Sequence, residues 1–147
     1  MPLRQILLIE DNADDAELIQ RALRRARVAN PVAWVDNGPL ALDWLHRTGP
    51  HTGRADEAPL FVMLDVKLPG MGGHEVLAAI RADPDPGIHL LPVVMLTSSN
   101  QDSDRLRGYS NGANAYVVKP VEFTELLRAV EALGYFWGII NQPPPTP

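Results

Sequence analysis

The stretch Ile6-Leu7-Leu8-Ile9-Glu10-Asp11 is the strongest indication of the fold, because a short apolar run ends directly at two carboxylates. The same pattern recurs twice: Asp65 follows Phe61-Val62-Met63-Leu64, and Lys119 follows Tyr116-Val117-Val118. Short apolar runs of this kind are typical of buried parallel strands. In an open α/β sheet, ligands bind at the carboxyl ends of such strands. The sequence therefore predicts that these four charged side chains meet at one edge of one sheet.

Strand and helix signals alternate along the rest of the chain. For example, Ile19, Ala22 and Leu23 recur at helical spacing behind a cap at Asn12 or Asp14. The expected strands are Leu3–Ile9, Val32–Val35, Leu60–Leu64, Leu91–Leu96 and Ala115–Val118. Further helices are expected from Pro39 through Leu45 and over Gly73–Arg81, Asp102–Asn111 and Glu122–Leu133, with a long loop over Thr48–Pro59. This order predicts a doubly wound α/β fold, a five-stranded parallel sheet with helices on both faces.

Bulk properties narrow the class of protein. A chain of 147 residues with 46% hydrophobic residues suits one globular domain. The net charge of −5 argues against broad nucleic-acid binding, and the absence of cysteine excludes disulfides and thiol catalysis. The apolar runs are too short to span a bilayer, and no signal-peptide layout precedes the first strand. We therefore expect a cytoplasmic protein that binds neither membranes nor nucleic acid directly.

The expected sheet edge suits a cation and a phosphoryl group. Magnesium prefers oxygen ligands, and Glu10, Asp11 and Asp65 supply carboxylates of that type. Without a cation, converging carboxylates repel, so at least one pKa is expected to rise. An aspartate can also attack phosphorus, and Lys119 can then stabilise the phosphoryl oxygens. The plainer alternative is that Asp11 only caps a helix and that Lys119 precedes a simple turn at Pro120.

Four motifs together resemble a known family. They are Glu10-Asp11-Asn12, Leu64-Asp65-Val66-Lys67-Leu68-Pro69-Gly70, Leu96-Thr97-Ser98-Ser99 and Tyr116-Val117-Val118-Lys119-Pro120. They stand in the order and setting of response regulator receiver domains, and the resemblance covers about Leu3 to Leu133. It implies the five-stranded flavodoxin-like fold of the chemotaxis response regulators. It also implies a signalling domain that catalyses only its own phosphorylation and dephosphorylation.

The resemblance assigns the acidic residues to phosphorylation. Asp65 would accept a phosphoryl group from a sensor histidine kinase or a phosphotransfer protein. Asp11 and Asp65 would bind Mg2+ (or Mn2+), with Glu10 acting through water and Lys67 offering its backbone carbonyl. Glu10 stands where the family more often has aspartate, which puts its direct metal contact in doubt.

The resemblance assigns other residues to the switch. Thr97 would hydrogen-bond one phosphoryl oxygen, Lys119 would pair with another, and Tyr116 would move inward as Thr97 moves. Lys67 and Ser99 occupy positions that tune hydrolysis, and Pro120 would follow Lys119 in a cis peptide. The readout surface would comprise the helix Asp102–Asn111, the strand Ala115–Val118 and the helix Glu122–Leu133.

Two features resemble single-domain regulators paired with bacterial phytochromes. One is the stretch from Gly108 to Tyr116, and the other is a C-terminal extension over residues 135–147, aromatic and then proline-rich. We expect a receiver domain over residues 1–134 and no separate output domain. The aromatics Tyr135, Phe136 and Trp137 could fold back on the domain, or pack on a second copy. We favour a homodimer through the last helix and this extension, since rigid aromatics are typical interface anchors.

Other classes fit less well. An aspartyl-nucleophile phosphohydrolase of the haloacid dehalogenase type needs a second aspartate two residues after the first, where Lys67 stands. A pseudo-receiver that only binds a partner would not need Asp65, Thr97 and Lys119 together. The chain has no Gly-x-x-x-x-Gly-Lys-[Ser/Thr] motif, and its four histidines have no metal-ligand spacing.

Overall fold

The computed structural model describes residues 3–54 and 57–145. Its strands form one parallel sheet in the order β2-β1-β3-β4-β5. The strands are β1 Ile6–Ile9, β2 Val32–Val35, β3 Val62–Leu64, β4 Val93–Thr97 and β5 Ala115–Val118. This is the strand order of flavodoxin-like doubly wound sheets. The predicted fold class is therefore confirmed.

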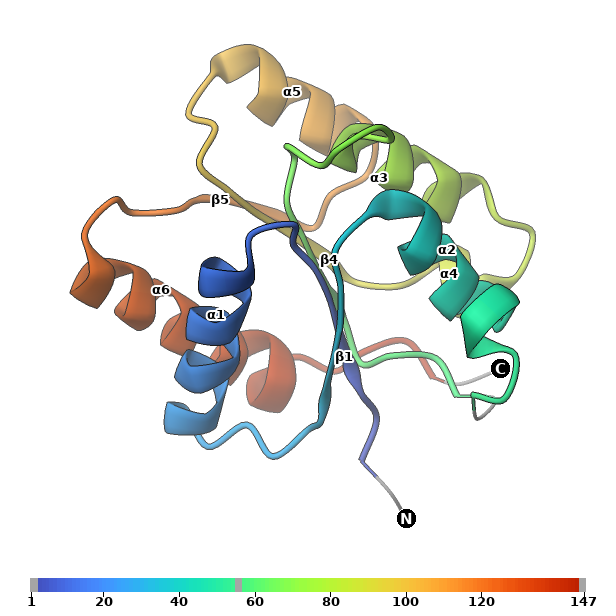
Figure 1. Cartoon of the computed structure of the whole chain (residues 1–147), viewed down its shortest axis with the longest axis horizontal. Helices are drawn as coiled ribbons and strands as arrows, with labels where there is room; N and C mark the ends of the chain where they lie inside the picture. Colours follow the sequence, from blue (N-terminus) through green and yellow to red (C-terminus); the bar gives the residue numbers. More distant parts are fainter. Residues whose placement is uncertain (1–2, 55–56, 146–147) are drawn as a thin grey trace.

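Helices cover both faces of the sheet, as Figure 1 shows. Helices α1 and α6 pack side by side on one face, while α2, α3 and α5 lie on the other. The helices are α1 Ala13–Arg25, α2 Gly38–His46, α3 Gly73–Ala82, α4 Pro86–His89, α5 Asp102–Ser110 and α6 Phe123–Tyr135. Asn12 caps α1 by accepting a hydrogen bond from the Asp15 N–H, which selects one of the two predicted caps. Over the described residues, no helix has the length and apolar character needed to cross a membrane.

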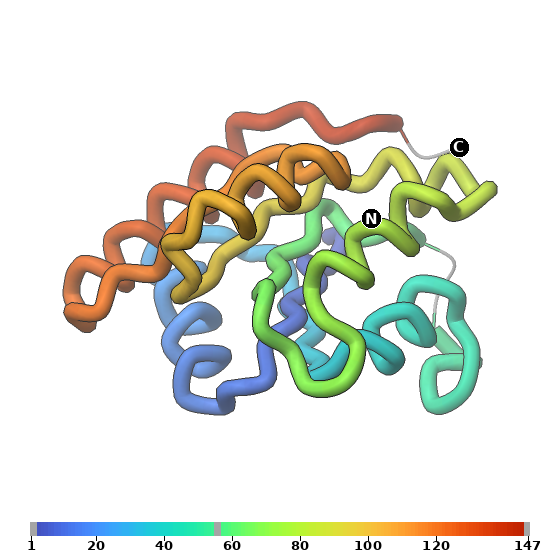
Figure 2. The backbone as a smooth tube through the Cα atoms, turned by 90° about the horizontal axis from the view of Figure 1, so that it is seen from above, coloured from blue at the N-terminus to red at the C-terminus, as the bar shows by residue number. Residues whose placement is uncertain are grey.

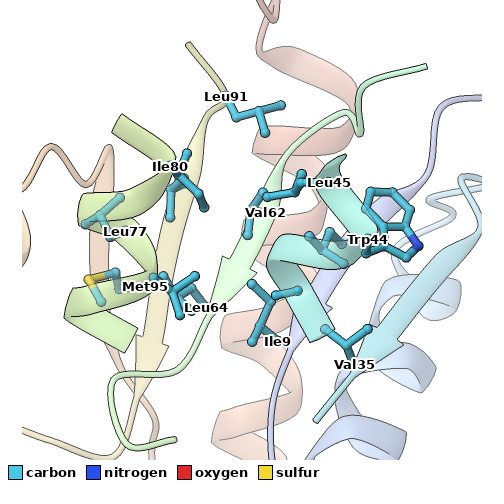
Figure 3. Close-up of a cluster of buried hydrophobic side chains, with 14 of the residues drawn as sticks. Ile9, Val35, Trp44, Leu45, Val62, Leu64, Leu77, Ile80, Leu91 and Met95 are labelled. Carbon is cyan, nitrogen blue, oxygen red and sulfur yellow. The ribbon is translucent and has the colours of Figure 1, made fainter. Parts of the chain in front are cut away.

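Alternating side chains of the central strands build two separate cores. In β1, Leu7 and Ile9 face the α2–α3 layer, whereas Ile6 and Leu8 face the α1–α6 layer. Figure 3 shows the first core, where Trp44 of α2 and side chains of α3 pack over β1, β3 and β4. Because both faces are buried, the strands read as continuous apolar runs rather than as alternating ones. This explains why the runs were visible in the sequence.

The sequence did not predict every element. Helix α4 lies at the end of a proline- and glycine-containing stretch that indicated only a loop. It forms because Asp85 accepts a hydrogen bond from the Gly87 N–H, and Pro86 suits the first helical position. A short 3-10 turn, η1 (Gly49–His51), lies in the expected loop over Thr48–Pro59, of which residues 55–56 fall outside the described part.

The C-terminal segment stays on the domain. Helix α6 continues into a π-helical turn, η2 (Phe136–Ile140), in which Trp137 packs against the core under α1 and α6. The chain then runs along the amino-end side of the sheet toward α4, as Figures 1 and 2 show. There Pro144 and Pro145 lie beside Arg4. Part of the extension therefore folds back, while Tyr135 and Phe136 remain exposed.

Gly73 at the start of α3 fixes the segment that follows β3. A Cβ atom at this position would lie 2.1 Å from the Asp65 carbonyl oxygen and 2.8 Å from the Val66 Cα. The backbone of α3 can approach this closely only because residue 73 has no side chain. Gly72 is a matched neighbour, since a Cβ there would meet no atom nearer than 3.7 Å.

We expect Gly73→Ala to lower the free energy of unfolding by about 1–3 kcal/mol, because the added methyl group must displace backbone. Gly72→Ala should cost less, about 0.5–1 kcal/mol, because Gly72 is the N-cap of α3, where alanine is less favourable than glycine. Urea unfolding followed by circular dichroism measures both. Equal losses in the two variants would contradict the close approach described for Gly73.

Candidate functional site

The carboxyl ends of four strands bring the predicted side chains together. Glu10 follows β1, Asp65 follows β3 and Lys119 follows β5, while Thr97 is the last residue of β4. Strand β2 is added on one side of β1, whereas β3 is added on the other side, so the strand order switches direction between β1 and β3. Ligands of doubly wound sheets usually bind at the carboxyl ends of the strands at this switch point. The predicted convergence of charges is thus confirmed.

The Lys119 ammonium is the centre of the site. Its Nζ atom donates to Glu10 Oε2 at 2.7 Å, to Asp65 Oδ2 at 3.1 Å and to Asp15 Oδ2 at 3.1 Å. The side chain is only 7% exposed. Because an ammonium has three N–H donors, every donor of Lys119 has a carboxylate partner.

Three carboxylates are placed to share a cation. Ligand oxygens of Glu10, Asp11 and Asp65 all lie within 4.8 Å of one another. Glu10 and Asp65 are buried and Asp11 is exposed, so the group opens to solvent on one side. The Asp65 Oδ1 atom also accepts a hydrogen bond from the Lys67 N–H at 3.2 Å, which orients the carboxylate. This set of oxygen donors fits a hard divalent cation, and the Lys67 carbonyl as a further ligand stays a prediction.

Burial and charge perturb the pKa values at the centre. Burial raises the pKa of Glu10 to about 7, helped by the Asp65 charge and opposed by the hydrogen bond from Lys119. Burial alone would lower the pKa of Lys119, but Glu10, Asp65 and Asp15 together raise it above its ordinary value. The ammonium therefore stays charged, and Glu10 is the carboxylate that resists ionisation when no cation is bound.

A hydrogen-bonded chain leads from Thr97 to Tyr116 through Ser99. The Ser99 N–H donates to Thr97 Oγ1 at 3.3 Å, and the Ser99 carbonyl accepts from the Tyr116 hydroxyl at 3.0 Å. The Ser99 hydroxyl donates to Asp104 Oδ2 at 2.5 Å, which lowers the pKa of Asp104. Asp104 also contacts His74 Nε2 of α3 at 3.4 Å. Ser99 thus links the end of β4 to β5, α5 and α3.

Sequence reasoning missed three of these contacts. By its sequence alone, Asp15 suits the positive N-terminal end of a helix, and its place one helical turn beyond Asp11 is the only signal that it lies near the same edge. The indole N–H of Trp34 in β2 donates to the Glu10 carbonyl at 2.7 Å, and nothing in the sequence signalled this. The Asp104–His74 contact joins two helices whose relative placement depends on the tertiary fold.

One backbone prediction is wrong. None of the described peptide bonds is cis, so the Lys119–Pro120 peptide is trans. A trans bond is the lower-energy isomer even before proline, by about 0.5–1 kcal/mol. The Lys119 N–H donates to the Thr97 carbonyl at 2.6 Å, which ties the end of β5 to β4.

The chain matches a known family over most of its length. The response regulator receiver domain pattern covers residues 6–131. The chain belongs to the response regulator receiver family. Among curated relatives, the probable methanogenesis regulatory protein FilR2 of Methanothrix harundinacea is 40% identical over 95% of this chain and 86% of its own. Response regulator Rcp1 of Synechocystis sp. is 31% identical over 92% of this chain and 90% of its own.

Solved receiver structures agree with the fold. The phosphorylated cyanobacterial phytochrome response regulator RcpA matches with a TM-score of 0.89 and 32% identity, over 97% of this chain and 99% of its own. The Mn2+-bound form of Rcp1 matches with a TM-score of 0.88 and 30% identity, over 97% of this chain and 99% of its own. The bacteriophytochrome response regulator RtBRR is 45% identical with a TM-score of 0.76, over 97% and 85% of the two chains. This receiver therefore resembles regulators of two-component signalling that include phytochrome response regulators.

The raised pKa of Glu10 predicts a pH-dependent stability in metal-free protein. The folded receiver binds the proton of Glu10 more tightly than the unfolded chain does, so this proton stabilises the fold. The stabilisation is fully present below pH 4.5 and is lost as the pH rises through 7. In EDTA, we expect the free energy of unfolding to fall across this range by up to about 3 kcal/mol more than in Glu10→Gln. Urea unfolding at several pH values measures the difference, and parallel pH profiles for the two proteins would contradict it.

Proposed function

We propose that this receiver accepts a phosphoryl group on Asp65 from a sensor histidine kinase or a phosphotransfer protein. The observation that carries the proposal is the contact of the buried Asp65 carboxylate with Lys119, beside two further carboxylates at the carboxyl edge of the sheet. Mg2+ or Mn2+ is the proposed cofactor, held by Asp11, Asp65 and Glu10 with the Lys67 carbonyl. The Mn2+-bound form of the relative Rcp1 supports this choice.

Each step of the transfer has a residue to perform it. An oxygen of Asp65 attacks the phosphorus, and the P–N bond of the donor phosphohistidine breaks as the new O–P bond forms. The imidazole leaves with the bonding electron pair and takes a proton from solvent. Lys119 donates an N–H to one phosphoryl oxygen, and the Thr97 hydroxyl donates to another. When bound, the cation supplies further positive charge to the same oxygens.

Phosphorylation would change the partners of Thr97. The phosphoryl group adds about −1.5 to −2 charges and three acceptor oxygens. If Thr97 turns its hydroxyl toward them, the Ser99 N–H loses its acceptor, and Ser99 also holds the Tyr116 hydroxyl. The change would thereby reach α5 and β5, which form the predicted readout surface together with α6. Exposed apolar side chains on this surface, Leu106 and Tyr109 of α5 and Phe123 of α6, offer contacts to a partner.

A bacterial phytochrome is the proposed partner kinase. The likeness to RcpA, Rcp1 and RtBRR supports this, since two of these three proteins are named as phytochrome or bacteriophytochrome regulators. The proposed receiver acts in the cytoplasm as a phosphorylated signalling domain rather than as a turnover enzyme. Its output then passes through binding to another protein.

A homodimer through α6 and η2 is the proposed assembly. Four apolar side chains remain exposed at this end of the receiver: Tyr135, Phe136, Ile139 and Ile140. Trp137 packs on the receiver's own core and so anchors the turn that presents them. Exposed aromatic and aliphatic side chains gathered on one turn are typical of a protein–protein contact.

We expect Tyr135→Ala/Phe136→Ser to convert the dimer into a monomer without unfolding, because both side chains are exposed and Trp137 is kept. Light scattering coupled to size-exclusion chromatography measures the mass. Tyr109→Ala on α5 removes an equally exposed tyrosine and should leave the dimer intact. A wild-type mass of one chain would contradict the assembly.

Phosphorylation should depend on Asp65. We expect acetyl phosphate with Mg2+ to label wild-type receiver and to leave Asp65→Asn unlabelled, because the amide cannot form the O–P bond. Asp36→Asn is the control, since Asp36 is exposed and follows β2 at the same edge. Retardation in a phosphate-binding gel measures the label. Equal labelling of wild type and Asp65→Asn would overturn the proposed function.

A further inference from the structure

Asp15 contacts the Lys119 ammonium, although the sequence did not predict it as a site residue. It lies in the first turn of α1, and its Oδ2 atom accepts the third N–H of Lys119 at 3.1 Å. Its backbone N–H donates to the Asn12 side chain, so the helix cap does not use the Asp15 carboxylate. The side chain is one-third exposed, which places it at the rim of the site.

The other two acceptors of Lys119 have second roles. Asp65 Oδ2 belongs to the carboxylate that would be phosphorylated, and Glu10 belongs to the oxygen cluster that would hold the cation. A phosphoryl group on Asp65 and a cation beside Glu10 would therefore each compete for an acceptor of Lys119. Asp15 is not a member of that cluster, so neither event requires its contact with Lys119 to change.

A buried ammonium needs acceptors throughout. Leaving a buried donor without a partner is destabilising, and more so for a charged group. If Lys119 gives one N–H to a phosphoryl oxygen and loses Glu10 to the cation, Asp15 is the protein acceptor that remains. The contact with Asp15 also fixes the position of the ammonium, because the four-carbon side chain of a lysine is otherwise flexible.

We propose that Asp15 is a positioning residue that holds the Lys119 ammonium in place while the phosphoryl group is transferred to Asp65. The role rests on the proposed function of Asp65. The plainer alternative is that Asp15 only complements the N-terminal end of the α1 dipole. Asp14, its exposed neighbour in the same turn, would serve that purpose equally and makes no contact with Lys119 among the described interactions.

The test compares Asp15→Ala, Asp15→Asn and the matched control Asp14→Ala. Phosphorylation by acetyl phosphate is followed at saturating Mg2+, and Mg2+ affinity is measured separately by tryptophan fluorescence, since Trp34 contacts Glu10. We expect Asp15→Ala to lower the phosphorylation rate constant about three- to tenfold relative to Asp14→Ala. The Mg2+ affinities of these two variants should agree within about twofold, since both lose one charge near the site.

Asp15→Asn should recover most of the lost rate, because its amide oxygen still accepts a hydrogen bond. Because alanine has a high helix propensity, we expect α1 to be retained in the alanine variants. Urea unfolding of each variant checks this. Equal rates for Asp15→Ala and Asp14→Ala would overturn the positioning role, and so would an Asp15→Asn protein as slow as Asp15→Ala. A loss confined to Mg2+ affinity would overturn it as well. If instead labelling persists in Asp65→Asn, the proposed function itself fails.

Discussion

The ammonium of Lys119, buried among three carboxylates, is the interaction on which the site depends. Removing a charge from water costs several kcal/mol, which only close partners can offset. A well-packed apolar residue would often stabilise such a position at least as well. The cluster therefore suits the proposed phosphoryl transfer better than it suits stability, since each of its charged groups has a place in that proposal.

The sheet makes this cluster possible. Parallel strands end at a common edge, so residues that follow β1, β3 and β5 meet although they are distant in sequence. The apolar cores on both faces hold the strands in register, and the absence of a side chain at Gly73 lets α3 approach the Asp65 backbone. The rigid part of the receiver thus places the charges. In the proposed switch, the segment after β4 would move, because its hydrogen bonds through Ser99 depend on the Thr97 hydroxyl.

The sequence predicted the fold and most of the site for one physical reason. Strands buried on both faces are continuous apolar runs, and a charge directly after such a run must lie at the edge of the sheet. Strands β2 and β5 were predicted with their observed bounds, and Glu10, Asp65 and Lys119 were predicted to meet. Contacts between separate elements could not be predicted in this way. The contact of Asp15 with Lys119 depends on how α1 packs on the sheet, and that of Asp104 with His74 depends on how α5 packs beside α3.

Locating the phosphoryl group by chemistry is the sharpest test of transfer to Asp65. An aspartyl phosphate is an acyl phosphate, so borohydride reduces it to homoserine, and tandem mass spectrometry of the digested protein then gives its position. We expect homoserine at position 65, formed only after treatment with both Mg2+ and a phosphodonor. Homoserine at another aspartate, or a stable phosphoryl group that borohydride does not reduce, would contradict it.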